Sequence, residues 1–95
     1  MAELPRGMAW GPHEPPCENT EVLRHVRAPG RPVAMLSLHE GQWSATVNMQ
    51  APSVVYWRTA RMSSKDQARH CVAVWARREI LRIHHDLRRY TQHSP

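Results

Sequence analysis

The chain has little cysteine and no long apolar run. Its two cysteines, Cys17 and Cys71, are too few for a disulfide framework, which excludes the disulfide-rich class of small secreted domains. No segment approaches the ~18 consecutive apolar residues that a membrane span needs, and residues 1–16 lack the apolar region of a secretory signal. We therefore expect a reduced, cytoplasmic protein without membrane partners.

Sequence motifs for catalysis and metal binding are also missing. The chain contains no nucleophile elbow, no phosphate-binding loop and no paired-carboxylate motif, so we predict neither enzymatic activity nor a cofactor. Histidine and cysteine occur close together at His13 and Cys17 and at His70 and Cys71. Zinc sites, however, usually show two tight ligand pairs, and adjacent residues on a helix point about 100° apart. We predict no metal site.

Positive charge is abundant and unevenly distributed. Residues 1–40 contain four Arg and five Glu, for a net charge of −1, whereas residues 41–95 carry a net charge of +6. Twelve of the 13 basic residues are arginine. Arginine makes bidentate contacts with phosphate, although a GC-rich genome also favours its codons. A basic half next to a neutral half indicates a nucleic-acid or other anionic partner.

The composition of the chain divides it into a short segment, one domain and a tail. Residues 1–18 contain four prolines and two glycines, which predicts an extended, mobile and disordered segment. A single α+β domain is expected over residues 19–92, followed by a tail at 93–95. Within it, Asn19-Thr20 could cap a short helix that uses Val22, Leu23 and Val26 and ends before Gly30.

The middle of the chain predicts a three-stranded antiparallel sheet. The segment 33–39 is apolar on both faces, which indicates a covered strand. The residues at 43–50 alternate, so that Trp43, Ala45, Val47 and Met49 should face the core. A third strand is expected at 54–62. Its facing stays open, because either the set Val54, Tyr56 and Ala60 or the set Val55 and Trp57 could point inward.

The last third of the chain predicts one long amphipathic helix from Ser64 to about Tyr90, about 40 Å long, that is capped by Ser63 or Ser64. Its apolar stripe comprises Ala68, Val72, Trp75, Ala76, Ile80, Ile83, Leu87 and Tyr90, and its opposite side carries Arg77, Arg78, Arg82, His84, His85, Arg88 and Arg89. The stripe should pack on one face of the sheet. Since such a helix is longer than a three-stranded sheet, Ile83, Leu87 and Tyr90 should project and need another partner, either the N-terminal segment or a second copy of the chain in a homodimer.

The junction between the third strand and the helix resembles the helix start of double-stranded RNA-binding domains. The segment SSKDQARHCVAVWA (63–76) matches that family's pattern at Ser64, Lys65, Ala68, Arg69, Ala73 and Ala76, and the resemblance covers roughly residues 20–76. It implies phosphate contacts by Lys65 and Arg69. The second lysine of the family pattern is Asp66 here, and Thr59–Arg61 replace the family's glycines.

The same region is similar to AP2-like and integrase amino-terminal DNA-binding domains. Those domains also have a strand that carries tryptophan, a third strand and a Ser/Thr-x-x-x-Ala helix start. The resemblance implies that the outer face of the sheet enters a DNA groove. Here that face would present Ser44, Thr46, Asn48, Trp57 and Arg61.

These patterns together favour a small basic nucleic-acid-binding module, for DNA or RNA, that contacts phosphates from its long helix. The expected contact residues are Lys65 and Arg69 by resemblance, and Arg77, Arg78, Arg82, Arg88 and Arg89 by the helical pattern. The alternative is a protein-interaction module, such as a small regulator or inhibitor, whose projecting helix dimerises or docks on an acidic partner. Pairing of Glu79 with Arg82 and of Arg82 with Asp86 would neutralise part of the helix charge.

Overall fold

The computed structural model describes residues 3–13, 17 and 19–93, which form an α+β fold. The elements, in chain order, are β1 (Met8–Pro12), β2 (Thr20–His25), β3 (Ala34–His39), β4 (Gln42–Val47), the 3₁₀ helix η1 (Val54–Tyr56), β5 (Arg58–Met62), α1 (Lys65–Arg78) and α2 (Ile80–His93). The predicted α+β class is confirmed, but the structure has five strands and two α-helices where three strands and one long helix were expected.

The five strands form one antiparallel meander in the order β1-β2-β3-β4-β5. Strands β3 and β4 are joined by a tight hairpin, in which Glu40 and Gly41 both have positive φ, at 51° and 76°. That conformation matches the twist of the flanking strands and favours glycine. Strands β3 and β4 agree with the sequence prediction apart from their ends.

The segment that was expected to form a short helix after Asn19 is strand β2. It pairs with β1 on one side and β3 on the other. Its neighbouring residues Val22 and Leu23 point to opposite faces, yet both are buried, with exposed fractions of 2% and 0%. A strand that is covered on both faces does not alternate between apolar and polar residues. Two adjacent apolar residues, such as Val22 and Leu23, then resemble part of the apolar face of a helix.

The prediction of a disordered segment over residues 1–18 is wrong for Met8–Pro12, which form edge strand β1. Met8 lies opposite His25 and Trp10 lies opposite Leu23 in the register of the sheet. Met8 is buried in the core, and Trp10 packs against it. Proline is tolerated here because an edge strand needs hydrogen bonds on one side only. The prolines at 15 and 16 lie outside the described residues.

The expected third strand begins later than predicted. Val54, Val55 and Tyr56 form η1, and all three side chains are exposed, so neither of the two predicted facings applies to them. The Ser53 side chain caps this turn by accepting a hydrogen bond from the Val55 N–H, and Asn48 Nδ2 donates to the Tyr56 carbonyl at 3.1 Å. These side-chain bonds satisfy backbone groups in the turn, which a continuous strand would satisfy through its ladder.

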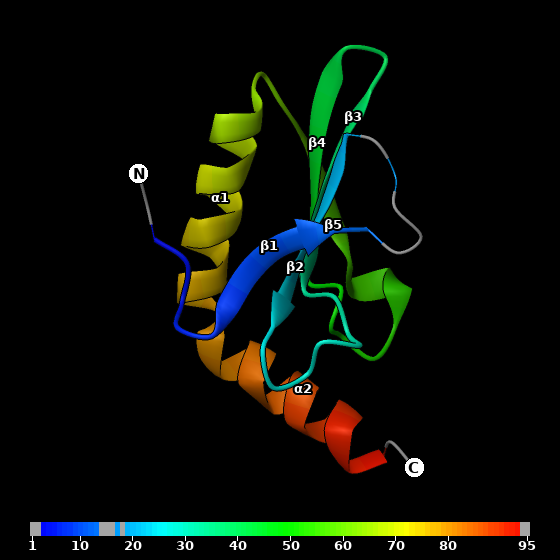
Figure 1. Ribbon diagram of the computed structural model, residues 1–95. Helices are drawn as coiled ribbons and strands as arrows, with labels where there is room; N and C mark the ends of the chain where they lie inside the picture. The colour runs from blue at the N-terminus through cyan, green and yellow to red at the C-terminus, as the bar shows by residue number, and fades with distance from the viewer. Residues whose placement is uncertain (1–2, 14–16, 18, 94–95) are drawn as a thin grey trace.

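The helix α1 covers one face of the sheet (Figure 1). Ser64 caps it by accepting a hydrogen bond from the Gln67 N–H, and the Gln67 side chain accepts from the Ser63 N–H in return, a reciprocal capping arrangement. Its buried stripe, Ala68, Val72 and Ala76, matches the prediction. Ala45 of β4 lies in the same core, with Trp43 and Val47 packed against it, which confirms the predicted facing of that strand.

The long helix is interrupted at Glu79, and α2 turns beneath the lower end of the sheet (Figure 1). Ile83 and Leu87 consequently join the core cluster, with exposed fractions of 0% and 5%. The prediction that they project and form a homodimer is wrong for these two residues, because their apolar surface is already covered within the chain. Of the three, Tyr90 alone is partly exposed, at 37%.

Candidate anion-binding pocket

The two basic residues that the family resemblance indicates are held together by one carboxylate. Lys65 forms an ion pair with Glu21 of β2, and Arg69 Nη2 donates to both Glu21 oxygens, at 2.8 and 2.5 Å. Lys65 Nζ also lies 5.6 Å from the centroid of the Trp43 ring. These contacts fasten α1 to the sheet and neutralise part of the charge that a phosphate would need.

Glu21 is ionised in this arrangement. Burial raises the pKa of its carboxyl group, but the hydrogen bonds and charges of Lys65 and Arg69 outweigh burial, and the net pKa lies below its usual value. The group therefore stays negative at neutral pH. Strong phosphate binding at Lys65 and Arg69 would have to compete with a carboxylate that belongs to the same fold.

The arginines that the helical pattern indicates lie at different places. Arg82 Nη2 is 3.3 Å from Glu79 Oε2, so the predicted pair with Glu79 is confirmed. Arg77 lines a hollow of about 350 Å³ together with Glu3 and Arg6. Arg78 and Arg89 are exposed on α1 and α2 and form no ion pair or hydrogen bond with the described part of the chain.

Asp86, the other predicted partner of Arg82, contacts Gln50 instead. Its Oδ2 accepts a hydrogen bond from Gln50 Nε2 at 3.2 Å, and that nitrogen also donates to Asn48 Oδ1 at 2.8 Å. Gln50 is buried, so this network anchors α2 to the loop after β4. The acidic side chain of α2 is thereby used in packing.

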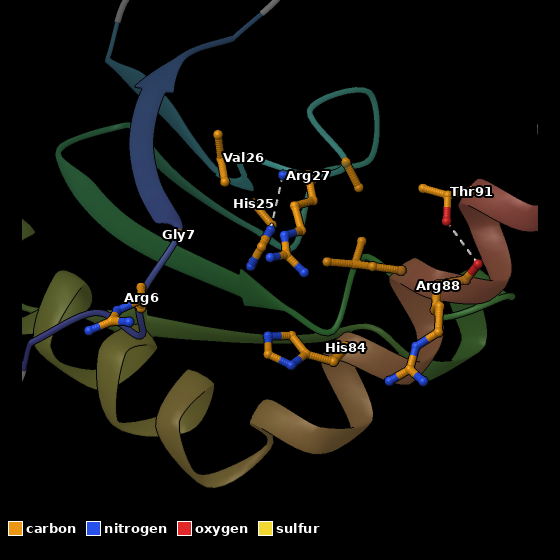
Figure 2. A pocket seen from close by; sticks show the side chains of 10 residues that line it. Arg6, Gly7, His25, Val26, Arg27, His84, Arg88 and Thr91 are labelled. Carbon is orange, nitrogen blue, oxygen red and sulfur yellow. Dashed lines mark hydrogen bonds between the residues drawn. The ribbon is translucent and has the colours of Figure 1, made fainter.

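A larger pocket, of about 550 Å³, opens where β1, the end of β2 and α2 meet (Figure 2). We call it the Arg–His pocket. It is lined by Arg6, Gly7, His25, Val26, Arg27, Ala28, His84, Leu87, Arg88 and Thr91. Of the seven arginine and lysine positions predicted as contacts, it contains Arg88.

The floor of the Arg–His pocket is built by a tight turn at the end of β2. The Ala28 N–H donates to the His25 carbonyl at 3.0 Å, and the Arg27 N–H donates to His25 Nδ1 at 3.1 Å. Gly7 lies against the same ring with φ +86°, and a Cβ at this position would be 2.9 Å from His25 Nε2. Glycine is required here both by the backbone conformation and by the close approach of the imidazole.

The two histidines of the pocket contact each other. Their ring centroids are 5.4 Å apart and the ring planes are nearly perpendicular. Burial lowers the pKa of His25, and the charges of His84 and Arg27 lower it further. Because Nδ1 accepts a hydrogen bond, the proton of the neutral His25 ring is on Nε2. His84, in contrast, is exposed on α2.

Three arginines, Arg6, Arg27 and Arg88, line the pocket that contains these rings. Arg27 lies beside His25, and Arg88 and Arg6 lie farther away on opposite sides of His84, with the Arg6 side chain directed away from that ring (Figure 2). None of the three guanidinium groups forms an ion pair or a side-chain hydrogen bond with the described residues, and none of the described residues that line the pocket is acidic. Unpaired positive charge at a concave surface attracts anions and concentrates them locally. The pocket can therefore bind an anion by charge-assisted hydrogen bonds.

Most of this pocket could not be found from the sequence pattern. Arg6 belongs to the segment predicted to be disordered, and His25 and Arg27 belong to the segment predicted to be a helix. His25 is the last residue of β2 and Arg27 is the second residue after it, so assignment of residues 20–25 as a strand would have placed both at the same end of the sheet. The segments that meet at the pocket are far apart in the sequence, so no local spacing indicates it.

Among the described residues, no group of three or more histidine, cysteine or acidic residues could hold a metal ion. No helix of that part of the chain is long and apolar enough to cross a membrane.

Comparison of the chain with family models, with curated proteins and with solved structures gives no match.

Proposed function

We propose that this chain is a nucleic-acid-binding module that contacts phosphates, with the Arg–His pocket as its principal contact. The observation that carries the proposal is that Arg6, Arg27 and Arg88 line one pocket, form no ion pair with the described residues, and share that pocket with no acid among its described lining. Planar guanidinium groups donate two hydrogen bonds to a phosphate at once. The net charge of +5 favours the same class of partner.

The exposed arginines outside the pocket extend this basic surface. Arg78 and Arg89 have no acidic partner among the described residues, and Arg77 shares its hollow with Arg6. Contacts of this kind position a backbone but do not read bases, so affinity should depend strongly on salt and weakly on sequence. Lys65, Arg69 and Arg82 should contribute less, because each is paired with a glutamate.

The alternative is a module that binds an acidic protein at the same arginines. Two of the three residues predicted for its helix-mediated interface, Ile83 and Leu87, are buried in the core. Nucleic acid supplies a regular array of phosphates to several separate guanidinium groups, which fits the distribution of charge better. Binding to an acidic protein is thus the outcome that a failed nucleic-acid experiment would favour.

The test is fluorescence polarisation with labelled duplex DNA, duplex RNA and single strands from 50 to 200 mM salt. We expect binding to at least one of them, with a salt slope that falls by about 0.9 in duplex DNA for each phosphate contact removed. The double variant Arg27→Gln, Arg88→Gln should weaken binding and reduce the slope. The control variant Arg58→Gln, Arg61→Gln makes the same change in charge on the opposite edge strand, β5, and should bind almost as the wild type does.

Two results would count against the proposal. If the control pair weakened binding as much as the pocket pair, either net charge or the sheet face with Arg61 that the AP2-like resemblance implies, and not the pocket, would be responsible. If the wild type bound none of the probes in a salt-dependent manner, the nucleic-acid function would be wrong. The pair Lys65→Gln, Arg69→Gln adds a third comparison, and a complete loss of binding there would favour the site that the double-stranded RNA-binding resemblance implies.

A further inference from the structure

The Arg–His pocket is larger and more mixed in character than a site for a simple inorganic anion. Its volume of about 550 Å³ lies within the ~300–1,000 Å³ that is typical of pockets for small organic ligands. Apolar side chains line part of it: Leu87 and Ala28 are buried in the core, and Val26 is 72% exposed. The ligand should therefore combine an anionic group with an organic body.

Aromatic surface is available next to the positive charge. His84 is exposed on α2, and its ring lines the same pocket as Arg27 and Arg88 (Figure 2). An imidazole ring offers a flat face on which a nucleobase can stack, and base stacking tolerates any of the four bases. Charge at the rim and a stacking surface next to the charges match the two parts of a nucleotide.

We propose that the Arg–His pocket binds a nucleoside monophosphate, either free or as the phosphorylated end of a strand, with its phosphate on Arg27 and Arg88 and its base against His84. This inference rests on the proposed function in that it assigns the same pocket to phosphate recognition. It goes further by naming a terminal phosphate and one base as the bound unit.

The number of arginines favours a terminal phosphate over a phosphate within a strand. A phosphate monoester carries about −1.5 to −2 charges at neutral pH and has three free oxygens, whereas a phosphodiester within a strand carries one negative charge. The guanidinium groups of Arg27 and Arg88 each carry five N–H donors, which together are enough for all three oxygens. No described carboxylate in the lining repels the second negative charge.

The test is isothermal titration of the full chain with three small probes at fixed ionic strength. AMP should bind. Adenosine should not bind measurably, because it lacks the charge, and ribose 5-phosphate should bind about tenfold more weakly than AMP, because it lacks the stacked base. Equal binding of AMP and ribose 5-phosphate, or of AMP and adenosine, would overturn the assignment.

A pair of neighbouring histidines provides a matched control. His84→Ala should weaken AMP binding about tenfold and leave the affinity for ribose 5-phosphate almost unchanged, since only the base contacts the ring. His85→Ala removes the adjacent exposed histidine of α2, which does not line the pocket, and should have no effect. Both positions are exposed, so both variants should fold, and equal effects of the two changes would overturn the role given to His84.

Short oligonucleotides distinguish the two sources of the ligand and separate this inference from the proposed function. A strand with a 5′-phosphate should bind about tenfold more tightly than the same strand with a 5′-hydroxyl, through the additional charge-assisted hydrogen bonds. If both strands bind equally and AMP does not compete, the nucleic-acid function stands and the terminal-nucleotide site is wrong. If AMP binds and no strand does, the pocket assignment stands for the free nucleotide and the nucleic-acid function is wrong.

Discussion

At the scale of single residues, His25 carries out two tasks that conflict at low pH. Its side chain is buried, and it also forms the floor of a pocket that is lined by three arginines. Its neutral ring accepts a hydrogen bond from the Arg27 N–H. Protonation would remove that acceptor and would add a charge between Arg27 and His84, which explains why burial and these neighbours lower its pKa.

This pKa shift predicts a pH dependence of stability. The unfolded chain protonates His25 below about pH 6.5, whereas the folded chain resists protonation until a lower pH. In that window the unfolded state binds more protons, so the free energy of unfolding falls as the pH decreases. We expect the melting temperature, followed by circular dichroism, to drop between pH 7.5 and 5.

Two asparagine variants identify the residue responsible. His25→Asn keeps a hydrogen-bond acceptor near the position of Nδ1 but cannot be protonated, and it should flatten the pH profile. His39→Asn makes the same change on β3 at a side chain that is 86% exposed, and it should leave the profile unchanged. A profile that is as steep in His25→Asn as in the wild type would show that another group causes the dependence.

At the scale of the elements, the interruption at Glu79 decides what α2 does. Sharp bends in helices usually occur at proline, glycine or an inserted residue, and none of these marks residues 76–82. The Glu79 N–H still donates to the Trp75 carbonyl, and the Ile83 N–H donates to the Glu79 carbonyl. Tertiary contacts therefore account for the bend, since it brings Ile83 and Leu87 into the core.

Two substitutions on α2 test this packing. Ile83→Ala should reduce the free energy of unfolding by about 2–5 kcal/mol, because it leaves a cavity at a fully buried position. Leu81→Ala removes a large apolar side chain two residues earlier that is 82% exposed, and it should change stability by less than about 0.5 kcal/mol. Urea denaturation measures both. Equal losses would mean that α2 does not dock as described.

At the scale of the whole molecule, β1 is an integral edge strand of the sheet and not a segment that lies outside the domain. It covers the edge of β2, and it contributes Met8 to the core. Deletion of residues 1–12 would expose the unpaired backbone groups of β2, which is a surface that promotes association between chains.

The truncation prediction follows directly. A chain that begins at residue 13 should melt at a clearly lower temperature and should associate, as judged by light scattering. The variant Ala9→Ser changes an exposed side chain of the same strand and keeps the backbone pairing, so it should behave as the wild type does. An unchanged melting temperature of the truncated chain would show that β1 is dispensable.

The sequence predicted the parts of the fold whose periodicity is strong and local. The core facing of Trp43, Ala45 and Val47, the cap at Ser64 and the buried stripe of α1 are all present. The expected water-facing side of the same segment is wrong at Thr46 and Asn48, which are buried. Sequence prediction also failed where tertiary contacts overrode local signals: the doubly covered strand β2, the proline-containing edge strand β1 and the bend at Glu79. The same failures hid Arg6, His25 and Arg27, because a pocket made by distant segments depends on the topology that brings them together.

The Arg–His pocket joins the beginning, the first third and the end of the chain, and this makes occupancy and folding one coupled equilibrium. A ligand that bridges these segments acts as a removable cross-link, which is lost whenever the chain opens. At a hundredfold excess over its Kd, such a ligand adds about 2.7 kcal/mol to the folded state. For a domain of this size, that increase raises the melting temperature by roughly 10–20 °C. Thermal denaturation is consequently a direct reporter of what the pocket holds, and a collection of anionic metabolites can be ranked by it without any assay of activity.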